Sequence, residues 1–231
     1  MLYLLAPFAY IGTIFGDNES IIKIPLLLAD LAILFFLVKI FPHKKQKLIL
    51  FYFLNPIIIY SIYIHSQLDI IPTALLFGSV YFLLLDKIKI SSIFFGLALS
   101  TKFHVIIALP LVLFYLYKKQ KSIKVVEYIA ISFFILLLLD LPFLFSEGFL
   151  NMVLLNPKQT LLFDTFYSIG TLKILLPIAA ILMVYLHFFN QNKVNQDLLF
   201  FYFGLLFTAT VFFIYPAPAW YVWMIPFLSI Y

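Results

Sequence analysis

Long apolar runs, separated by short polar connections, constrain this chain more than any other feature of its sequence. Hydrophobic residues make up 65% of the 231 residues and charged residues only 11%, whereas soluble domains average about 45–50% apolar and about 25% charged residues. The runs are Ile21–Phe41, Leu48–Ile64, Ile70–Leu85, Ile90–Tyr117, Ile123–Phe145, Leu172–Phe189, Leu198–Tyr215 and Ala219–Tyr231. Backbone groups in lipid must be hydrogen-bonded within their own segment, so each run is expected to be helical. The sequence therefore predicts an all-α, polytopic transmembrane helical bundle with about eight membrane segments, in a single domain.

The lysines predict the orientation of these helices. Eleven of the 15 lysines lie at alternate connections, namely Lys39, Lys44, Lys45, Lys47, Lys87, Lys89, Lys118, Lys119, Lys121, Lys124 and Lys193. Cytoplasmic loops of membrane proteins carry an excess of Lys, so these connections are expected in the cytoplasm. The other set, which includes residues 65–69 and 146–171, is then expected on the non-cytoplasmic side. This pattern accounts for the net charge of +5 without a nucleic-acid partner.

One run, Ile90–Tyr117, is interrupted by the polar residues 101–104 and is expected to fold back on itself, because both of its ends are rich in lysine. As a helix, Ile90–Ser100 is only about 16 Å long, roughly half of a ~30 Å hydrocarbon core. The residues 90–117 therefore form either a short re-entrant hairpin or a fuller, tilted pair of crossings. In both cases Lys102 and His104 are expected to face other protein or a wet cavity.

Lys102 is the most informative single residue of the sequence. An uncompensated lysine in mid-membrane costs about 2.5–3.5 kcal/mol or more. An ion pair with Asp69 or Asp30, or extension of the side chain to the membrane surface, would reduce that cost. The functional alternative is an anion site, for example for a lipid-linked phosphate.

Two further polar or aromatic clusters are candidate sites. The segment His65-Ser66-Gln67-Leu68-Asp69 is either an ordinary hydrated loop or a site at the membrane boundary, and His65 and Asp69 share a face if it is helical. Near the C-terminus, Tyr215, Trp220 and Tyr221 form either an interfacial aromatic belt or a surface for a sugar.

Several classes of site are not expected. The chain has no cysteine, which excludes disulfides and thiolate metal sites. The sequence has no glycine-rich phosphate loop and no metal-binding motif, and its four histidines are scattered, so neither a metal nor a cofactor is expected. No cleavable signal peptide is evident, because no basic segment precedes the first apolar residues.

The stretch of residues 54–116 resembles a known family of membrane enzymes. It reads Leu-Asn-Pro at 54–56, His-Ser-Gln-Leu-Asp at 65–69, Gly-Leu-Ala-Leu-Ser-Thr-Lys at 96–102, and then Pro110. This order resembles the integral-membrane glycosyltransferases of the GT-C class, especially their mannosyltransferase-like branch, and residues 215–226 resemble the late aromatic segment of that class. The resemblance implies transfer of a hexose, such as mannose, from a polyprenyl-phosphate carrier to a glycan, lipid or protein acceptor. The reaction would take place on the non-cytoplasmic face of a prokaryotic plasma membrane or of an endomembrane.

The resemblance also implies roles for particular residues. Asp69 and Gln67 would line the site, Lys102 would meet the carrier phosphate, and residues 215–221 would shape the sugar pocket. His65 and His104 are further candidates for substrate binding.

The sequence departs from the GT-C pattern at two places. Ser66 stands where the class often has glycine. The catalytic carboxylate of the class usually lies in the first external loop, whereas Asp17 lies downstream of that position. The chain is therefore expected to be a GT-C-like core that is incomplete at both ends, with Asp17 or Asp69 acting as the base.

Two other functions use the same residues. A transporter or flippase for a lipid-linked sugar would also need a buried lysine, carboxylates and aromatic side chains, but it predicts an inverted repeat, which is not evident. A non-catalytic membrane subunit that binds a partner protein would account for a shortened chain with few site residues.

Overall fold

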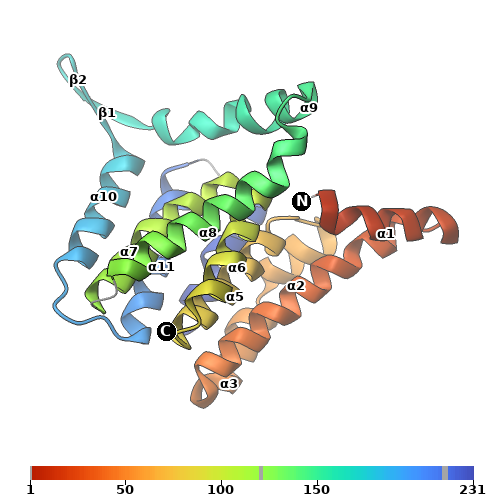
Figure 1. Ribbon diagram of the computed structural model, residues 1–231, viewed down its shortest axis with the longest axis horizontal. Helices are drawn as coiled ribbons and strands as arrows, with labels where there is room; N and C mark the ends of the chain where they lie inside the picture. Colours follow the sequence, from red (N-terminus) through yellow and green to blue (C-terminus); the bar gives the residue numbers. More distant parts are fainter. Residues whose placement is uncertain (1, 120–121, 215–217) are drawn as a thin grey trace.

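Helices make up 81% of the chain in the computed structural model, which describes residues 2–119, 122–214 and 218–231. They form a bundle with an arm across one end and a β hairpin that projects beyond it (Figure 1). The all-α class predicted from the sequence is therefore correct except for this short hairpin.

The first half of the chain supplies the centre of the bundle. Its elements are α1 (Leu2–Phe15), α2 (Asn18–Ile40), η1 (Pro42–Lys44), α3 (Lys45–Leu48), η2 (Ile49–Phe53), α4 (Pro56–Ile59), η3 (Tyr60–Ile64), α5 (Ile70–Leu84), α6 (Ile88–Thr101), η4 (Phe103–Ala108) and α7 (Leu109–Lys118).

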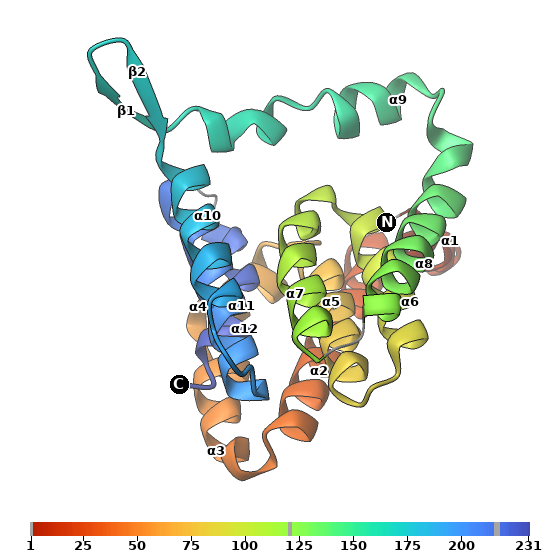
Figure 2. The ribbon, with the colours of Figure 1, turned by 60° about the vertical axis from the view of Figure 1, so that its left-hand side comes forward.

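The second half adds one central helix, the arm, the hairpin and a second group of helices. Its elements are α8 (Ser122–Asp140), η5 (Leu141–Phe143), α9 (Glu147–Phe149), η6 (Leu150–Leu154), η7 (Pro157–Phe163), β1 (Phe166–Ile169), β2 (Leu172–Leu175), α10 (Leu176–Phe189), α11 (Gln196–Phe213), η8 (Pro218–Trp223) and α12 (Ile225–Leu228). Figure 2 shows the arm, which we define as residues 147–163, crossing one end of the bundle from α8 to the hairpin.

Three helices in the described ranges are long and apolar enough to cross a membrane. They are Asn18–Ile40, Ser122–Phe143 and Gln196–Phe213. A fourth span results if Pro42–Phe53 and Pro56–Ile64, which are bent by 53° against each other, are taken as one crossing. The expected number of about eight membrane segments is therefore not confirmed, because five of the apolar helices have only 10–17 residues.

The bend at residues 54–56 has a local cause. Asn55 has an extended backbone, and its side-chain oxygen accepts a hydrogen bond of 2.9 Å from the N–H of Ile57. Proline follows at the first helical position, where its missing N–H is not needed. The segment that the sequence presents as one apolar run is thus two short helical pieces.

The core of the bundle is built around α6, which packs between α5 and α8. Gly96 permits the contact with α8, because a Cβ atom at this position would lie 2.6 Å from the carbonyl oxygen of Ser132. The hydroxyl groups of Ser79, in α5, and Tyr128, in α8, lie 2.8 Å apart within the protein interior. Small residues and buried hydroxyl groups are the usual means by which membrane helices approach closely.

The last apolar run, Ala219–Tyr231, does not form a crossing. It folds as η8 and α12 into the core, where Phe227 stacks on Phe77 with the ring centroids 4.4 Å apart. Phe207 of α11 stacks in turn on Trp223, at 5.5 Å. This run is apolar because it is buried in protein, and the expectation of a membrane helix here was wrong.

The run that begins at Leu172 also differs from its expectation. Leu172–Leu175 is strand β2, paired antiparallel with β1, and α10 begins only at Leu176. Gly170 has a φ of +61° in the turn between the strands, a conformation that glycine adopts without strain. Pro177 lies in the first turn of α10, where proline favours the start of a helix.

Candidate functional site

Lys102 and Asp69 form the centre of the candidate site. Lys102 lies directly after α6 with an extended backbone, and its Nζ donates to Oδ1 of Asp69, the residue before α5. The side chain of Asp69 is 3% exposed and that of Lys102 is 34% exposed. The helix break predicted at residues 101–104 is confirmed, and Asp69 rather than Asp30 is the partner of the lysine.

The second oxygen of the Asp69 carboxylate is also engaged. Its Oδ2 accepts a hydrogen bond of 2.6 Å from Nε2 of Gln67. The backbone carbonyl of Asp69 accepts a further bond of 2.8 Å from the hydroxyl of Thr73. The carboxylate therefore holds the ammonium group of Lys102 in place.

The segment 65–69 is a turn and not a helix, so His65 and Asp69 do not share a helical face. Ser66 has a φ of +54°, in the left-handed region that favours glycine. His65 is exposed, and its ring stacks on Tyr60 at 6.2 Å. Among the candidate residues of this turn, Gln67 contacts Asp69 and His65 does not hydrogen-bond to it in the described part of the chain.

Aromatic side chains from η8 complete the site. The Nζ of Lys102 lies 5.9 Å from the ring centroid of Trp220. His104 meets Trp223 edge to face, with the centroids 3.9 Å apart, and its Nε2 is buried without a hydrogen-bond partner among the described residues. The structure thus brings together Gln67, Asp69, Lys102 and Trp220.

The other aromatic candidates lie outside this group. Tyr221 is partly buried against the core, and Tyr215 lies outside the described residues. Trp223 was not among the predicted site residues, since nothing in the sequence connects it with His104.

Asp17, the other predicted acid, has a different environment. It is the N-cap of α2, and its Oδ1 accepts a hydrogen bond of 3.0 Å from the backbone N–H of Ser20. This bond holds the pKa of the Asp17 carboxyl below its ordinary value. No hydrogen bond or ion pair of the described residues joins Asp17 to Asp69 or Lys102.

Asp30 is a second buried carboxylate, and the hydroxyl groups of two tyrosines hydrogen-bond to it in the apolar interior. The residue is 0% exposed. Its two oxygens accept hydrogen bonds from the hydroxyl groups of Tyr52, at 2.5 Å, and Tyr63, at 2.7 Å. Buried carboxylates are retained where such bonds compensate their loss of water, so Asp30 connects α2 to the two halves of the bent segment.

A cavity of about 520 Å³ lies at the same end of α6 as Lys102. Its walls are mainly apolar and come from α1, α5, α6, α8 and the arm. Polar side chains that line it include Ser100, Thr101 and Asp140. No local sequence pattern connects Asp140 with the residues near Lys102.

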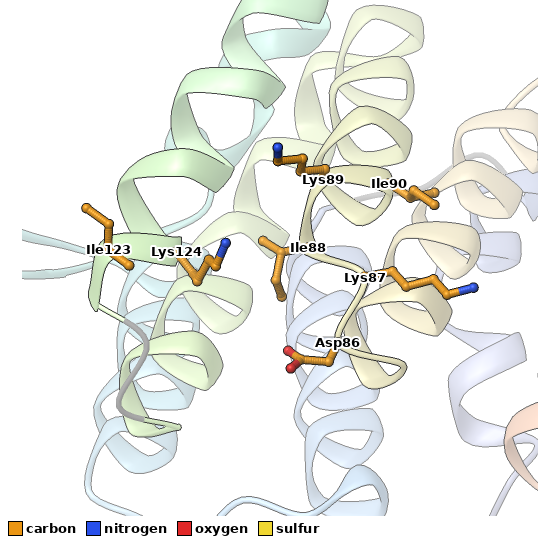
Figure 3. A pocket seen from close by; sticks show the side chains of 7 residues that line it. All are labelled: Asp86, Lys87, Ile88, Lys89, Ile90, Ile123 and Lys124. Atoms are coloured by element: carbon orange, nitrogen blue, oxygen red, sulfur yellow. The ribbon is translucent and has the colours of Figure 1, made fainter.

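A second cavity, of about 650 Å³, lies at the opposite end of α6. Figure 3 shows Lys89 and Lys124 pointing toward each other across it, while Lys87 points away. Glu127 lies 3.9 Å from the ammonium of Lys89 and 2.7 Å from that of Lys124. Lysines predicted to be cytoplasmic therefore lie at the end of the bundle that is opposite to the candidate site.

The described residues contain no group of three or more His, Cys, Asp or Glu side chains that could hold a metal ion. The candidate site consists instead of an ion pair, an amide and an indole, next to an apolar cavity. These groups can bind a phosphate and an amphipathic ligand, because an ammonium attracts an anion and an apolar wall accepts a lipid.

The family model of the ALG3 protein matches residues 21–153, which is more than half of the chain. The chain belongs to the ALG3 protein family. Membership of this family indicates a membrane glycosyltransferase of the GT-C type that uses a lipid-linked sugar donor and a glycan acceptor. No curated protein matches the chain, and no solved structure matches it.

The match to the ALG3 family bears on the site, because the matched residues include Gln67, Asp69, Lys102 and Asp140, while Trp220 lies beyond them. The apolar helices and the family together identify an integral membrane protein. The resemblance drawn from residues 54–116 is thereby confirmed at the level of the glycosyltransferase class.

Proposed function

We propose that this member of the ALG3 family transfers a hexose, with mannose as the first candidate, from a polyprenyl-phosphate carrier to a glycan acceptor. The proposed reaction takes place on the non-cytoplasmic face of the membrane. The observation that carries the proposal is the position of the Lys102 ammonium between the carboxylate of Asp69 and the indole ring of Trp220.

Lys102 is suited to the departing phosphate. When the bond between the anomeric carbon and the phosphate oxygen breaks, negative charge develops on the phosphate. A positioned cation in a low-dielectric site stabilises that charge much more strongly than it would in water. Lys102 is about one-third exposed, so a phosphate can reach its ammonium group.

Asp69 acts in this proposal as a positioning residue. Its oxygens accept hydrogen bonds from Lys102 and Gln67, and its side chain is 3% exposed, so its carboxylate orients the ammonium and is shielded from the acceptor. Trp220 offers a flat aromatic face beside the cation, which suits the apolar face of a sugar ring.

The decisive experiment measures sugar transfer by the purified protein in proteoliposomes. The donor is radiolabelled mannosyl polyprenyl phosphate, the comparison donor is the glucosyl compound, and the acceptor is an octyl mannoside. We expect transfer by the wild type and a loss of at least about 100-fold in kcat/KM in Lys102→Ala, because electrostatic groups of this kind contribute that much.

Lys173→Ala is the matched control, because Lys173 also lies over an aromatic ring, that of Phe166 at 4.6 Å, but on the exposed hairpin. Equal activity of Lys102→Ala and Lys173→Ala would contradict the assigned site. If the wild type moves the labelled donor across the liposome membrane without transferring sugar, the protein is a flippase. If it does neither, the result favours a non-catalytic membrane subunit.

A further inference from the structure

The lysine-rich cavity at the start of α6 has no part in the proposed transfer of sugar. Its volume is about 650 Å³, and its lining residues come from the turn after α5, the first residues of α6 and the first residues of α8. Lys102, by contrast, follows the last residue of α6. A ligand in this cavity therefore lies at the opposite end of the helix from the candidate site.

The charges around this cavity favour an anion. Among the described residues that line it, Lys87, Lys89 and Lys124 stand beside the carboxylate of Asp86. Figure 3 shows the side chains of Lys89 and Lys124 directed toward each other. Glu127 lies 3.9 Å from the ammonium of Lys89 and 2.7 Å from that of Lys124. Three ammonium groups of the described residues thus face two carboxylates, and the excess positive charge attracts an anion into the space between α6 and α8.

The start of α6 adds to this positive potential. Ile88, Lys89 and Ile90, the first three residues of the helix, all line the cavity. The first backbone N–H groups of a helix have no partner within it and carry a partial positive charge. The N-cap residue is Lys87, and the first turn contains no acidic residue. Because an ammonium cannot accept a hydrogen bond, the cap leaves this helix end free to support the lysines in binding an anion.

The rim of the cavity is apolar and exposed, which indicates that the ligand is more than a small anion. Ile90 and Ile123 line the cavity and are 40% and 77% exposed. Val126 and Phe134, at 64% and 62% exposure, continue from Ile123 at the spacing of one helix face. This face runs along Ser122–Phe143, one of the helices that can cross a membrane. An apolar chain attached to an anion in the cavity can therefore lie along α8.

We propose that this cavity binds the phosphate group of an anionic phospholipid, whose acyl chain lies along the exposed face of α8. Lysine binds phosphate as a point charge. Basic pockets between membrane helices on the cytoplasmic side bind anionic head groups, and the cytoplasmic leaflet carries a negative surface potential. The lysine-rich end is expected on that side. This inference does not rest on the proposed transfer of sugar.

The first test measures lipid binding by the purified protein in detergent micelles, with native mass spectrometry. The probes are dioleoyl phosphatidylglycerol, which is anionic, and dioleoyl phosphatidylcholine, which has the same chains and no net charge. We expect the first phosphatidylglycerol to bind at least about 5-fold more tightly than phosphatidylcholine, because one lysine near an anionic lipid contributes about that factor. Equal affinities for the two lipids overturn the proposal.

Variants locate the bound lipid. The side chains of Lys89 and Lys124 are 75% and 42% exposed, so their replacement leaves the core intact. Lys89→Gln and Lys124→Gln should each weaken the binding of phosphatidylglycerol by about 5-fold. Glu127→Gln removes a carboxylate that competes for the same two lysines and should strengthen the binding by a similar factor.

Lys45→Gln is the matched control, because it removes the same charge from an exposed lysine of α3 that does not line this cavity. We expect it to bind phosphatidylglycerol as the wild type does. If Lys45→Gln and Lys89→Gln lose the same affinity, the lipid responds to net charge alone and the assigned position is wrong.

A competition experiment distinguishes a lipid from a free phosphate. Inorganic phosphate and glycerol 3-phosphate carry the anion without the acyl chains, and we expect neither to displace phosphatidylglycerol at equal concentration. Ile123→Ser should weaken the binding of the lipid by about 4-fold, the effect of about one buried CH₂ group. Displacement by either small anion, or unchanged binding in Ile123→Ser, would exclude a lipid chain along α8 and contradict the proposal.

Discussion

The ammonium of Lys102 lies 5.9 Å from the ring centroid of Trp220, although the two residues belong to distant parts of the chain. This contact joins the segment after α6 to η8, which lies outside the region matched by the ALG3 family model. The C-terminal segment therefore contributes directly to the candidate site.

Replacement of Trp220 tests that contribution. A cation–π contact is worth about 0.5–2 kcal/mol, so Trp220→Ala should raise the donor KM by about 2- to 30-fold, and Trp220→Phe should raise it less. Phe212→Ala is the control, because this ring on α11 is exposed. An unchanged KM in Trp220→Ala would show that the indole has no part in binding the donor.

The pair of Lys102 and Asp69 predicts an asymmetry in stability. Lys102→Met leaves a carboxylate that is 3% exposed without its cation, whereas Asp69→Asn leaves an ammonium that is 34% exposed. Removal of one partner of a buried pair costs about 3–5 kcal/mol, and we expect Lys102→Met to approach this value and Asp69→Asn to cost less.

The double variant Asp69→Asn/Lys102→Met should recover most of the loss in stability and none of the transfer activity. Unfolding in mixed detergent micelles, followed by circular dichroism, measures the three free energies. Additive losses in the double variant would mean that the two side chains do not interact.

The two tyrosines on Asp30 give a third prediction. Tyr63→Phe removes the donor at 2.7 Å from a carboxylate that is fully buried. Loss of a hydrogen bond to a charged group costs about 1.5–3 kcal/mol, and we expect this reduction in the free energy of unfolding. Tyr60→Phe removes an exposed hydroxyl from a neighbouring ring in the same segment and should change stability by less than about 0.5 kcal/mol.

Run length and local signals predicted part of the fold. The helices α2, α8 and α11 follow from apolar runs of sufficient length, and the interruption at Lys102 follows from its charge. Apolarity does not distinguish a segment that faces lipid from one that is buried in protein. For this reason, the sequence did not reveal that Ala219–Tyr231 enters the core or that Leu172–Leu175 is a strand.

The candidate site was predictable only where its members are close in sequence. Gln67 and Asp69 lie in one turn, and a deep lysine requires a carboxylate, so their association with Lys102 was among the expected alternatives. Asp140 reaches the cavity through the parallel course of α6 and α8, which begin together near Lys89 and Lys124. Such a meeting depends on tertiary packing and leaves no local pattern.

The absence of a side chain at Gly96 allows the close approach of α6 and α8. In Gly96→Ala the new methyl group would lie 2.6 Å from the Ser132 carbonyl and 2.8 Å from Cβ of Ile135, so the helices must separate. Overpacking of this kind costs about 1–3 kcal/mol, and the melting temperature should fall. Gly148→Ala meets no atom within 4 Å and serves as the control. Equal melting temperatures of the two variants would argue against the packing of α6 on α8.

The absence of cysteine makes the sidedness of the membrane directly measurable. We expect Ser168→Cys, on the exposed hairpin beyond the candidate site, to react with a membrane-impermeant maleimide from the non-cytoplasmic side of intact cells. Lys89→Cys, at the lysine-rich end, should react only after permeabilisation, because lysine-rich loops stay in the cytoplasm. Val80→Cys, which is 0% exposed, should react only after denaturation and controls for leakage. The reverse labelling would place Lys102 and Asp140 on the cytoplasmic face, and the donor sugar would then have to be supplied from that leaflet.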